Sequence, residues 1–115
     1  MEKTYRIKKN TEIEEIVRLK NNVANNHFVV YYRINNANKH FRFAVSVPKK
    51  YGNAVRRNKI KRQIREIVRK ARFHDKSDFF VIVRIDVREL DYSTIKENLL
   101  KLFARAKILI EDRNI

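Results

Sequence analysis

The side chains with the clearest chemical potential form a cationic run between residues 49 and 72. This run contains eleven Lys and Arg and a single acid, Glu66, so it carries a net charge of +10 out of the +15 of the whole 115-residue chain. Positive charge gathered in one segment predicts a polyanion as partner, and nucleic acid is the most common polyanion in a cell. The alternative is a solvated helix face, but such faces seldom exclude acids so completely.

Two of these cations, Arg56 and Arg57, fall in what reads as the first turn of a helix. The N-terminus of a helix carries partial positive charge, so cations there are disfavoured by a few tenths to about 1 kcal/mol. The same helix start presents free backbone N–H groups, which suit phosphate, and the planar guanidinium of Arg suits bidentate phosphate contacts. A polyanion lying along the helix would relieve the repulsion between the cations. We therefore predict a docking helix for nucleic acid.

The hydrophobic pattern of this segment predicts a helix from Asn53, a good N-cap residue, to about Arg72. The acid Glu66 can pair with Arg62 or Lys70, four residues away, and leaves the other cations unneutralised. The apolar residues share one face at about 100° per residue, and the cations form a stripe beside it. A core needs that apolar face, which argues against a cationic helix on a membrane. The predicted core residues of this helix are Ile60, Ile64, Ile67, Val68 and Ala71.

The remaining polar residues predict no catalytic or metal site. His27, His40 and His74 lack metal-ligand spacing, and we expect them at strand ends or in loops. One glycine excludes a glycine-rich phosphate loop, and the absence of cysteine excludes disulfides and thiolate zinc sites. Several acids follow the basic helix and are expected to serve solvation or capping in loops: Asp75, Asp78, Asp86, Glu89 and Asp91.

Before the basic helix, the sequence predicts one helix and two strands. The helix opens at Thr11, where Glu14 three residues later completes a capping-box pattern. A polar connection, residues 21–26, leads to a strand at 27–34 that is rich in β-branched and aromatic residues. A second strand at 41–47 follows an Asn-rich turn, and we expect it to run antiparallel to the first.

After the basic helix, the sequence predicts one more strand and one more helix. Residues 79–85 are apolar on both faces of a strand, and the final helix begins between Asp91 and Thr94. The order α-β-β-α-β-α predicts an α/β two-layer sandwich with a small mixed sheet.

The second predicted strand has two different faces. Phe41, Phe43, Val45 and Val47 alternate onto one face, which we expect to join the core. Its other face carries Arg42, Ala44 and Ser46, and these small residues could floor a groove or simply meet solvent. Val29 and Tyr31 on the neighbouring strand would suit a single-stranded nucleic acid, although plain core packing explains them equally well.

The chain as a whole reads as a single domain over residues 1–115, with flexible ends at 1–5 and 111–115. The first ten residues lack the apolar core of a signal peptide, and no apolar run approaches the ~20 residues of a membrane span. We therefore expect a soluble, cytoplasmic protein.

The stretch from residue 49 to residue 66, KKYGNAVRRNKIKRQIRE, resembles the signature of the protein component of bacterial ribonuclease P. The resemblance extends to Ile7-Lys8-Lys9-Asn10 and to residues 23–29, and it covers essentially residues 3–110. Lys59 stands where arginine is usual in this family, which keeps the charge and loses the planar fork. The matching positions of the signature are Gly52, Asn53, Ala54, Val55, Arg57, Asn58, Lys59, Lys61, Arg62 and Arg65.

This resemblance implies a protein subunit that binds a large catalytic RNA and the 5′ leader of precursor tRNA. The RNA would hydrolyse the phosphodiester bond with magnesium, and no catalytic or metal-binding side chain is expected in this chain. It also implies a left-handed crossover through the basic helix, an exception to the usual right-handed rule. The implied RNA-binding residues are Lys49, Lys50, Asn53, Arg56, Arg57, Asn58, Lys59, Lys61, Arg62, Arg65 and Arg69.

The implied cleft for the leader lies between the sheet and the first helix. It would use Ile13, Val17, Val29, Tyr31 and Ser46. The family often has phenylalanines on the first helix, where this chain has Ile13 and Val17, so stacking would depend more on Tyr31.

Two other functions remain open. A ribosomal-protein-like RNA-binding module without a role in cleavage would share the fold and charge but not the signature. A stand-alone ribonuclease would need converging carboxylates or histidines, which the sequence does not offer. The sequence leaves the number of copies in an assembly open.

Overall fold

The computed structural model describes residues 3–110, and the structural statements below concern that part of the chain. Residues 1–2 and 111–115, which include most of the two ends predicted to be flexible, lie outside it. A short 3-10 turn, η1, spans Lys3–Tyr5. The ring of Tyr5 packs against that of His40, with 4.1 Å between their centroids.

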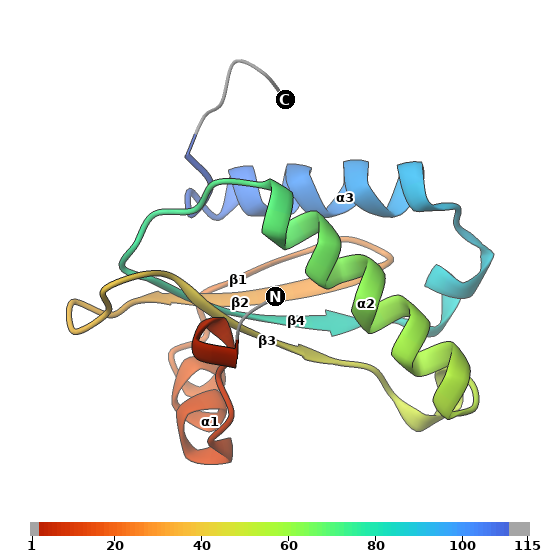
Figure 1. Cartoon of the computed structure of the whole chain (residues 1–115), viewed down its shortest axis with the longest axis horizontal. Coiled ribbons are helices and arrows are strands. Elements are labelled where there is room, and N and C mark those ends of the chain that lie inside the picture. The colour runs from red at the N-terminus through yellow and green to blue at the C-terminus, as the bar shows by residue number, and fades with distance from the viewer. Residues whose placement is uncertain (1–2, 111–115) are drawn as a thin grey trace.

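Three α-helices and a four-stranded mixed sheet make up the fold, which confirms the predicted class (Figure 1). Two further 3-10 turns, η2 at Lys49–Tyr51 and η3 at Ile85–Glu89, precede α2 and α3. No helix within residues 3–110 is long and apolar enough to cross a membrane. The main elements in chain order are α1 (Asn10–Arg18), β1 (Asn22–Ala24), β2 (Phe28–Ile34), β3 (Arg42–Ser46), α2 (Ala54–Lys70), β4 (Ser77–Val83) and α3 (Tyr92–Arg105).

The strands lie in the order β1-β2-β4-β3. β4 is antiparallel to β2 and parallel to β3, so the strand at 41–47 runs antiparallel to the strand at 27–34, as predicted, but β4 lies between them. The physical reason is that β4 carries apolar residues on both faces and therefore takes a central place, where both of its edges form hydrogen bonds. Helix α2 connects β3 to its parallel neighbour β4.

Strand β1 was not predicted, because residues 21–26 read as a polar connection. It pairs antiparallel with β2 at the edge of the sheet, with Asn22 opposite Tyr31 and Ala24 opposite Val29. Backbone pairing with β2 thus holds a segment whose side chains have weak strand preference.

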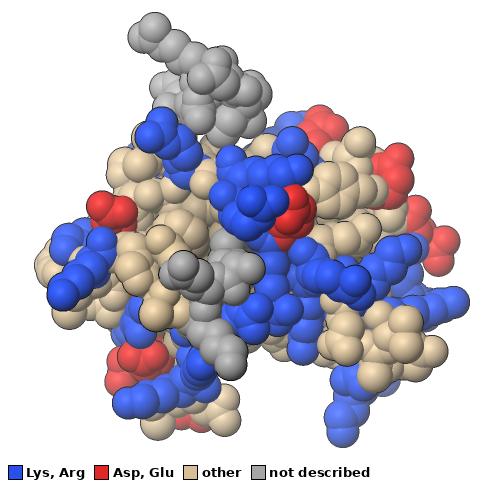
Figure 2. Space-filling view, in the orientation of Figure 1, with Lys and Arg blue, Asp and Glu red and all other residues tan. Residues whose placement is uncertain are grey.

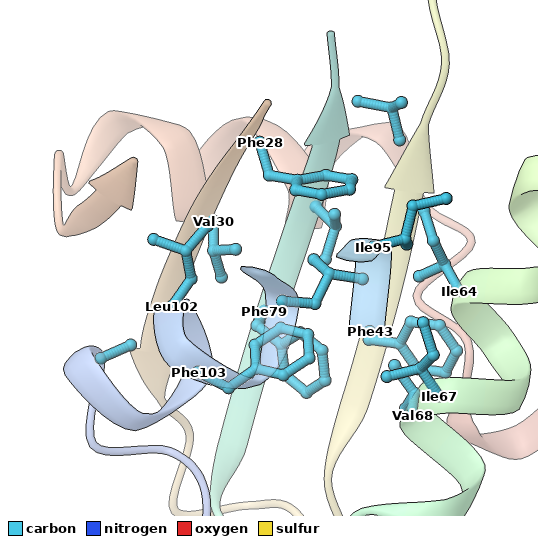
Figure 3. Packing of buried hydrophobic residues seen from close by; sticks show 14 of the residues in the cluster. Phe28, Val30, Phe43, Ile64, Ile67, Val68, Phe79, Ile95, Leu102 and Phe103 are labelled. Carbon is cyan, nitrogen blue, oxygen red and sulfur yellow. The ribbon is translucent and has the colours of Figure 1, made fainter. Parts of the chain in front are cut away.

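Helices α2 and α3 cover one face of the sheet, and α1 lies against the other (Figure 1). The core fills the space between the sheet and helices α2 and α3. The predicted apolar face of α2 is confirmed, since Ile60, Ile64, Ile67 and Val68 are fully buried and Ala71 packs against the same core. Figure 3 shows Ile64, Ile67 and Val68 of α2 in one cluster with residues of the strands and α3: Phe28, Val30, Phe43, Phe79, Ile95, Leu102 and Phe103.

Two of the three predicted helix starts are confirmed by their caps. The side chain of Asn53 accepts a hydrogen bond from the backbone N–H of Arg56 at 3.0 Å, and that of Asp91 accepts one from Thr94 at 2.8 Å. The predicted capping box at Thr11 is wrong. Helix α1 begins at Asn10, so Thr11 lies inside the helix, and the N-cap residue Lys9 makes no side-chain cap because a lysine side chain has no hydrogen-bond acceptor.

Candidate nucleic-acid interface

The chain reaches α2 through a tight turn that fixes the position of Arg56. Gly52 has φ 156° and ψ −169°, a region that essentially only glycine occupies. A Cβ atom on Gly52 would lie 2.9 Å from Cδ and 3.1 Å from Cβ of Arg56. The side chain of Arg56 therefore packs across the bare backbone of Gly52. Lys49 and Lys50 are exposed on η2 at the same turn, and Asn53 caps the helix.

The predicted cations of α2 lie in two rows. Arg57, Lys61 and Arg65, spaced four residues apart, are half-buried along one side of the helix. The others, Arg56, Lys59, Arg62 and Arg69, are exposed, and so is Asn58. Figure 2 shows the result, a band of Lys and Arg that crosses the face of the molecule where α2 lies.

Protein acids neutralise little of this band. Glu66 binds Arg69 at 2.6 Å and, as predicted, Lys70 at 3.2 Å, but it does not pair with Arg62. These two contacts lower the pKa of Glu66. Six predicted cations of α2 form no ion pair within the described chain: Arg56, Arg57, Lys59, Lys61, Arg62 and Arg65.

Arg6 joins the band from the N-terminal segment, and sequence reasoning missed it. A backbone bridge to Phe43 brings this segment beside β3. Arg6 lines a cavity of about 160 Å³ with Arg62, Arg65, Glu66 and Arg69. Burial, and then the charge of Arg6, lower the pKa of Arg65. No local pattern could have placed Arg6 here, because its neighbours on α2 are more than fifty positions away in the sequence.

Two of these guanidinium groups are incompletely paired. The Nε atoms of Arg6 and Arg57 are buried and have no hydrogen-bond partner among residues 3–110. A buried N–H without an acceptor costs on the order of 1–3 kcal/mol, more when it belongs to a charged group.

The other candidate surface is the open face of the sheet, the face on the side of α1. The strand register places the predicted residues together: Val29 lies opposite Ile82, which lies opposite Ser46, and Tyr31 lies opposite Phe80. All five side chains are half-exposed. Val29 and Tyr31 are therefore not core residues. Sequence reasoning missed Phe80 and Ile82, because a strand that is apolar on both faces gave no reason to expect either face to be open.

Helix α1 borders this face. Ile13 and Val17 are half-buried one turn apart on α1, and Ile16 between them is fully buried. The helix contacts both β2 and β4. We define the open sheet face as Val29, Tyr31, Ser46, Phe80 and Ile82, bordered by Ile13 and Val17 of α1.

A buried carboxylate anchors α1 at the end of the open sheet face. Asp78 is fully buried and accepts hydrogen bonds from Arg33, Arg42, Asn35 and Asn38 at 2.7–3.1 Å. The two arginines also bind acids of α1, Arg33 to Glu15 at 3.0 Å and Arg42 to Glu12 at 3.3 Å. The prediction that Asp78 serves solvation or capping in a loop is therefore wrong, because the residue lies within β4 between two arginines of neighbouring strands.

The electrostatics of Asp78 follow from these contacts. Its burial opposes ionisation, but hydrogen bonds from Arg42, Asn38, Asn35 and Arg33 outweigh that effect and lower the pKa of its carboxyl group. Ionised Asp78 in turn raises the pKa of Arg42. This cluster is therefore fully charged at neutral pH.

The histidines do not gather into a site. Nδ1 of His27 lies 2.8 Å from Asp86, which links the start of β2 to η3, and Nδ1 of His40 lies 2.9 Å from the carbonyl of Phe41. Across residues 3–110, no three His, Asp or Glu side chains come together as metal ligands.

Comparisons with known proteins agree with the signature around residue 52. The model of the family described as Ribonuclease P matches residues 1–107. The ribonuclease P protein component of Streptococcus equi subsp. equi (strain 4047) is 44% identical over 112 residues, which cover 96% of this chain and 93% of that protein. The same component of Macrococcus caseolyticus is 44% identical over 108 residues, 93% of this chain and 94% of that protein.

Two solved structures share the fold as well as the sequence. One is a Staphylococcus aureus RNase P protein mutant with defective mRNA degradation activity, with a TM-score of 0.85, 44% identity, and coverage of 94% of this chain and 92% of that one. The other is the RNase P protein from Thermotoga maritima, with a TM-score of 0.79, 33% identity, and coverage of 93% and 98%. The chain therefore belongs to the ribonuclease P protein component family.

Proposed function

We propose that this protein is the subunit of ribonuclease P that docks on the catalytic RNA through α2 and holds the 5′ leader of precursor tRNA on the open sheet face. Family membership supports the first half of this proposal. The observation that carries it is the band of cations on α2, in which Glu66 is the single acid and pairs only with Arg69 and Lys70 among the described residues.

Docking on RNA explains why the helix starts with cations. Phosphate groups can bind the guanidinium group of Arg57, and they accept hydrogen bonds from the side-chain amides of Asn53 and Asn58. Arg56 and the turn lysines extend the same surface beyond the helix start. Each phosphate that the protein neutralises releases counterions from the RNA, so binding weakens as salt rises.

The open sheet face suits a single RNA strand rather than a duplex. Aromatic side chains on a sheet stack unpaired bases, and Tyr31 and Phe80 lie side by side on neighbouring strands. Ile13 and Val17 offer apolar contact without stacking. The hydroxyl group of Ser46 can bond to the sugar–phosphate backbone.

In this proposal the chain positions RNA and the RNA subunit performs the hydrolysis. Magnesium is then held by RNA, because the described side chains do not assemble a set of acidic ligands for it. The leader strand would lie on the sheet while α2 is anchored on the catalytic RNA. The expected partners are thus the catalytic RNA and precursor tRNA, in the cytoplasm where tRNA matures.

The test is cleavage of a precursor tRNA by bacterial ribonuclease P RNA at low magnesium, with and without this protein. We expect the protein to restore cleavage and the triple variant Arg57→Ala, Arg62→Ala, Arg65→Ala to fail. If the protein binds RNA tightly but leaves cleavage unchanged, it is an RNA-binding module of another kind, as some ribosomal proteins are. Cleavage by the protein alone would favour a stand-alone ribonuclease.

A further inference from the structure

A second concave site lies beside the start of α2, on the side of η3 and α3. It is a cavity of about 320 Å³, at the small end of the ~300–1,000 Å³ that ligand sites usually enclose. We call it the η3 cavity. Its lining comes from η2, α2, η3 and the start of α3, and comprises Tyr51, Arg56, Lys59, Ile60, Gln63, Val87, Arg88, Leu90 and Ile95.

The innermost residues that line the η3 cavity are apolar. Ile60, Val87 and Ile95 are each at most 2% exposed and belong to the hydrophobic core. Leu90 is half-buried beside them. Because these side chains come from three different elements, the floor is formed only in the folded protein.

The rim of the cavity is cationic. Arg56, Lys59 and Arg88 are exposed at its edge, and none of the nine lining residues is acidic. These three cations have no carboxylate partner within the part of the chain that the structure describes. Arg88 donates one hydrogen bond, to the backbone carbonyl of Tyr51 at 3.3 Å, which holds its side chain at the rim.

One rim cation, Arg56, is held in place by packing, and the buried Tyr51 lies beside the rim. Arg56 packs across Gly52, where any larger residue would displace it. The ring of Tyr51 is almost fully buried, and burial raises the pKa of its hydroxyl group while the charges of Arg88 and Arg56 lower it by a smaller amount. The Tyr51 hydroxyl group therefore lies close to both guanidinium groups and stays protonated, as a hydrogen-bond donor, at neutral pH.

We propose that the η3 cavity binds one unstacked nucleotide of an RNA chain, with the base on the apolar floor and a phosphate between Arg56, Lys59 and Arg88. An apolar floor with a cationic rim matches a flat base joined to a phosphate. The amide of Gln63 and the hydroxyl of Tyr51 add hydrogen bonding for the edge of the base. This inference rests on the proposed function for the identity of its RNA, since Arg56 and Lys59 also belong to the docking surface.

The first experiment maps the cavity by NMR with the full-length protein labelled at Ile and Val methyl groups. The probes are a single-stranded hexaribonucleotide, 5′-AMP, and inorganic phosphate at matched ionic strength. We expect the methyl signals of Ile60, Val87 and Ile95 to shift and saturate with the hexaribonucleotide, and not with phosphate. Saturation with 5′-AMP at similar concentration would show that the cavity takes free nucleotides as well. If neither nucleotide probe moves these methyl signals, or phosphate moves them equally, the inference is wrong.

The second experiment compares two matched arginine variants for binding to ribonuclease P RNA. Arg88→Ala removes a rim cation, and Arg105→Ala removes an exposed arginine of α3 that likewise donates to a backbone carbonyl, at 3.4 Å. We expect Arg88→Ala to weaken binding about tenfold and Arg105→Ala to weaken it less than about twofold, with Arg88→Lys recovering part of the loss. Tyr51→Phe keeps the core filled and should weaken binding about threefold.

The two proposals can fail separately. If the unaltered protein stimulates cleavage of precursor tRNA while Arg88→Ala and Arg105→Ala bind the RNA equally well, the docking function stands and the nucleotide site is wrong. If the unaltered protein does not stimulate cleavage, the ribonuclease P proposal fails, and the NMR titration still decides whether the cavity takes a nucleotide.

Discussion

The arginines of this protein fall into two groups that differ in what neutralises them. At the base of α1, Arg33 and Arg42 each bind buried Asp78 and an acid of α1. On α2, the half-buried cations Arg57, Lys61 and Arg65 have no carboxylate partner among the described residues. The comparison shows that arginines are paired with acids and build the fold in one place, and remain without acidic partners in another.

The largest effect on stability is expected at the first group. Asp78→Ala leaves Arg33 and Arg42 without their shared buried carboxylate, and breaking such a pair costs about 3–5 kcal/mol. We expect the free energy of unfolding in urea to drop by about this amount. Glu66→Ala, which removes the exposed acid of the second group, should have a much smaller effect, because exposed ion pairs are screened by solvent. Equal losses in the two variants would contradict the distinction between the groups.

The largest effect on RNA binding is expected at the second group. Arg57→Ala, Lys61→Ala and Arg65→Ala together should weaken binding to ribonuclease P RNA by about two to three orders of magnitude and lower the salt dependence of binding. Because these cations repel one another in the free protein, the free energy of unfolding should stay the same or rise. A large loss of stability in this variant would show that the row belongs to the fold.

An effect of intermediate size is expected when pH is lowered, because the first group of arginines depends on the ionised carboxylate of Asp78. The pKa of Asp78 is lowered in the folded protein, so its contribution to stability is complete above its unfolded pKa of about 3.9 and is lost as pH falls through the lower folded value. We expect the free energy of unfolding to decline steeply below about pH 4. Asp78→Asn should flatten this decline, and the remainder should come from exposed acids with lowered pKa values, such as Asp91.

A smaller effect is expected at the turn before α2. In Gly52→Ala the new Cβ meets the side chain of Arg56, and the backbone region is unfavourable for alanine by about 1–3 kcal/mol. We expect a loss of stability in that range and a fivefold weaker affinity for RNA, on the order of one lost charge contact. Asn58→Ala, on the exposed surface of the helix, should leave stability unchanged. If Gly52→Ala binds RNA normally, the position of Arg56 does not matter for docking.

Local patterns in the sequence predicted the parts of the fold that depend on neighbours along the chain. The apolar stripe of α2 and its Asn53 cap depend on residues three or four positions apart, so periodicity and capping rules were enough. The same holds for the alternating faces of β3. The capping box at Thr11 failed because the helix begins one residue earlier, at Asn10, which places Thr11 inside the helix.

Long-range pairings could not be predicted in this way. The central position of β4 brings Asp78 next to Arg33 and Arg42, which are 45 and 36 residues away in sequence. Arg6, which precedes α2 in the sequence, and Arg88, which follows it, both lie beside α2 in the fold. A single charged residue in a sequence does not indicate which distant residues will be its neighbours. The open sheet face was predicted only in part, since Phe80 and Ile82 gave no hint of which face of β4 would be covered.

The central claim is that α2 holds the catalytic RNA while the open sheet face holds the leader. The most direct test measures binding of precursor tRNA to the assembled protein–RNA complex, using substrates with a long leader and with a one-nucleotide leader. We predict that Tyr31→Ala weakens binding of the long-leader substrate about tenfold, leaves the short-leader substrate unchanged, and does not alter assembly with the catalytic RNA. Equal weakening of both substrates, or a loss of assembly in Tyr31→Ala, would contradict this division of roles.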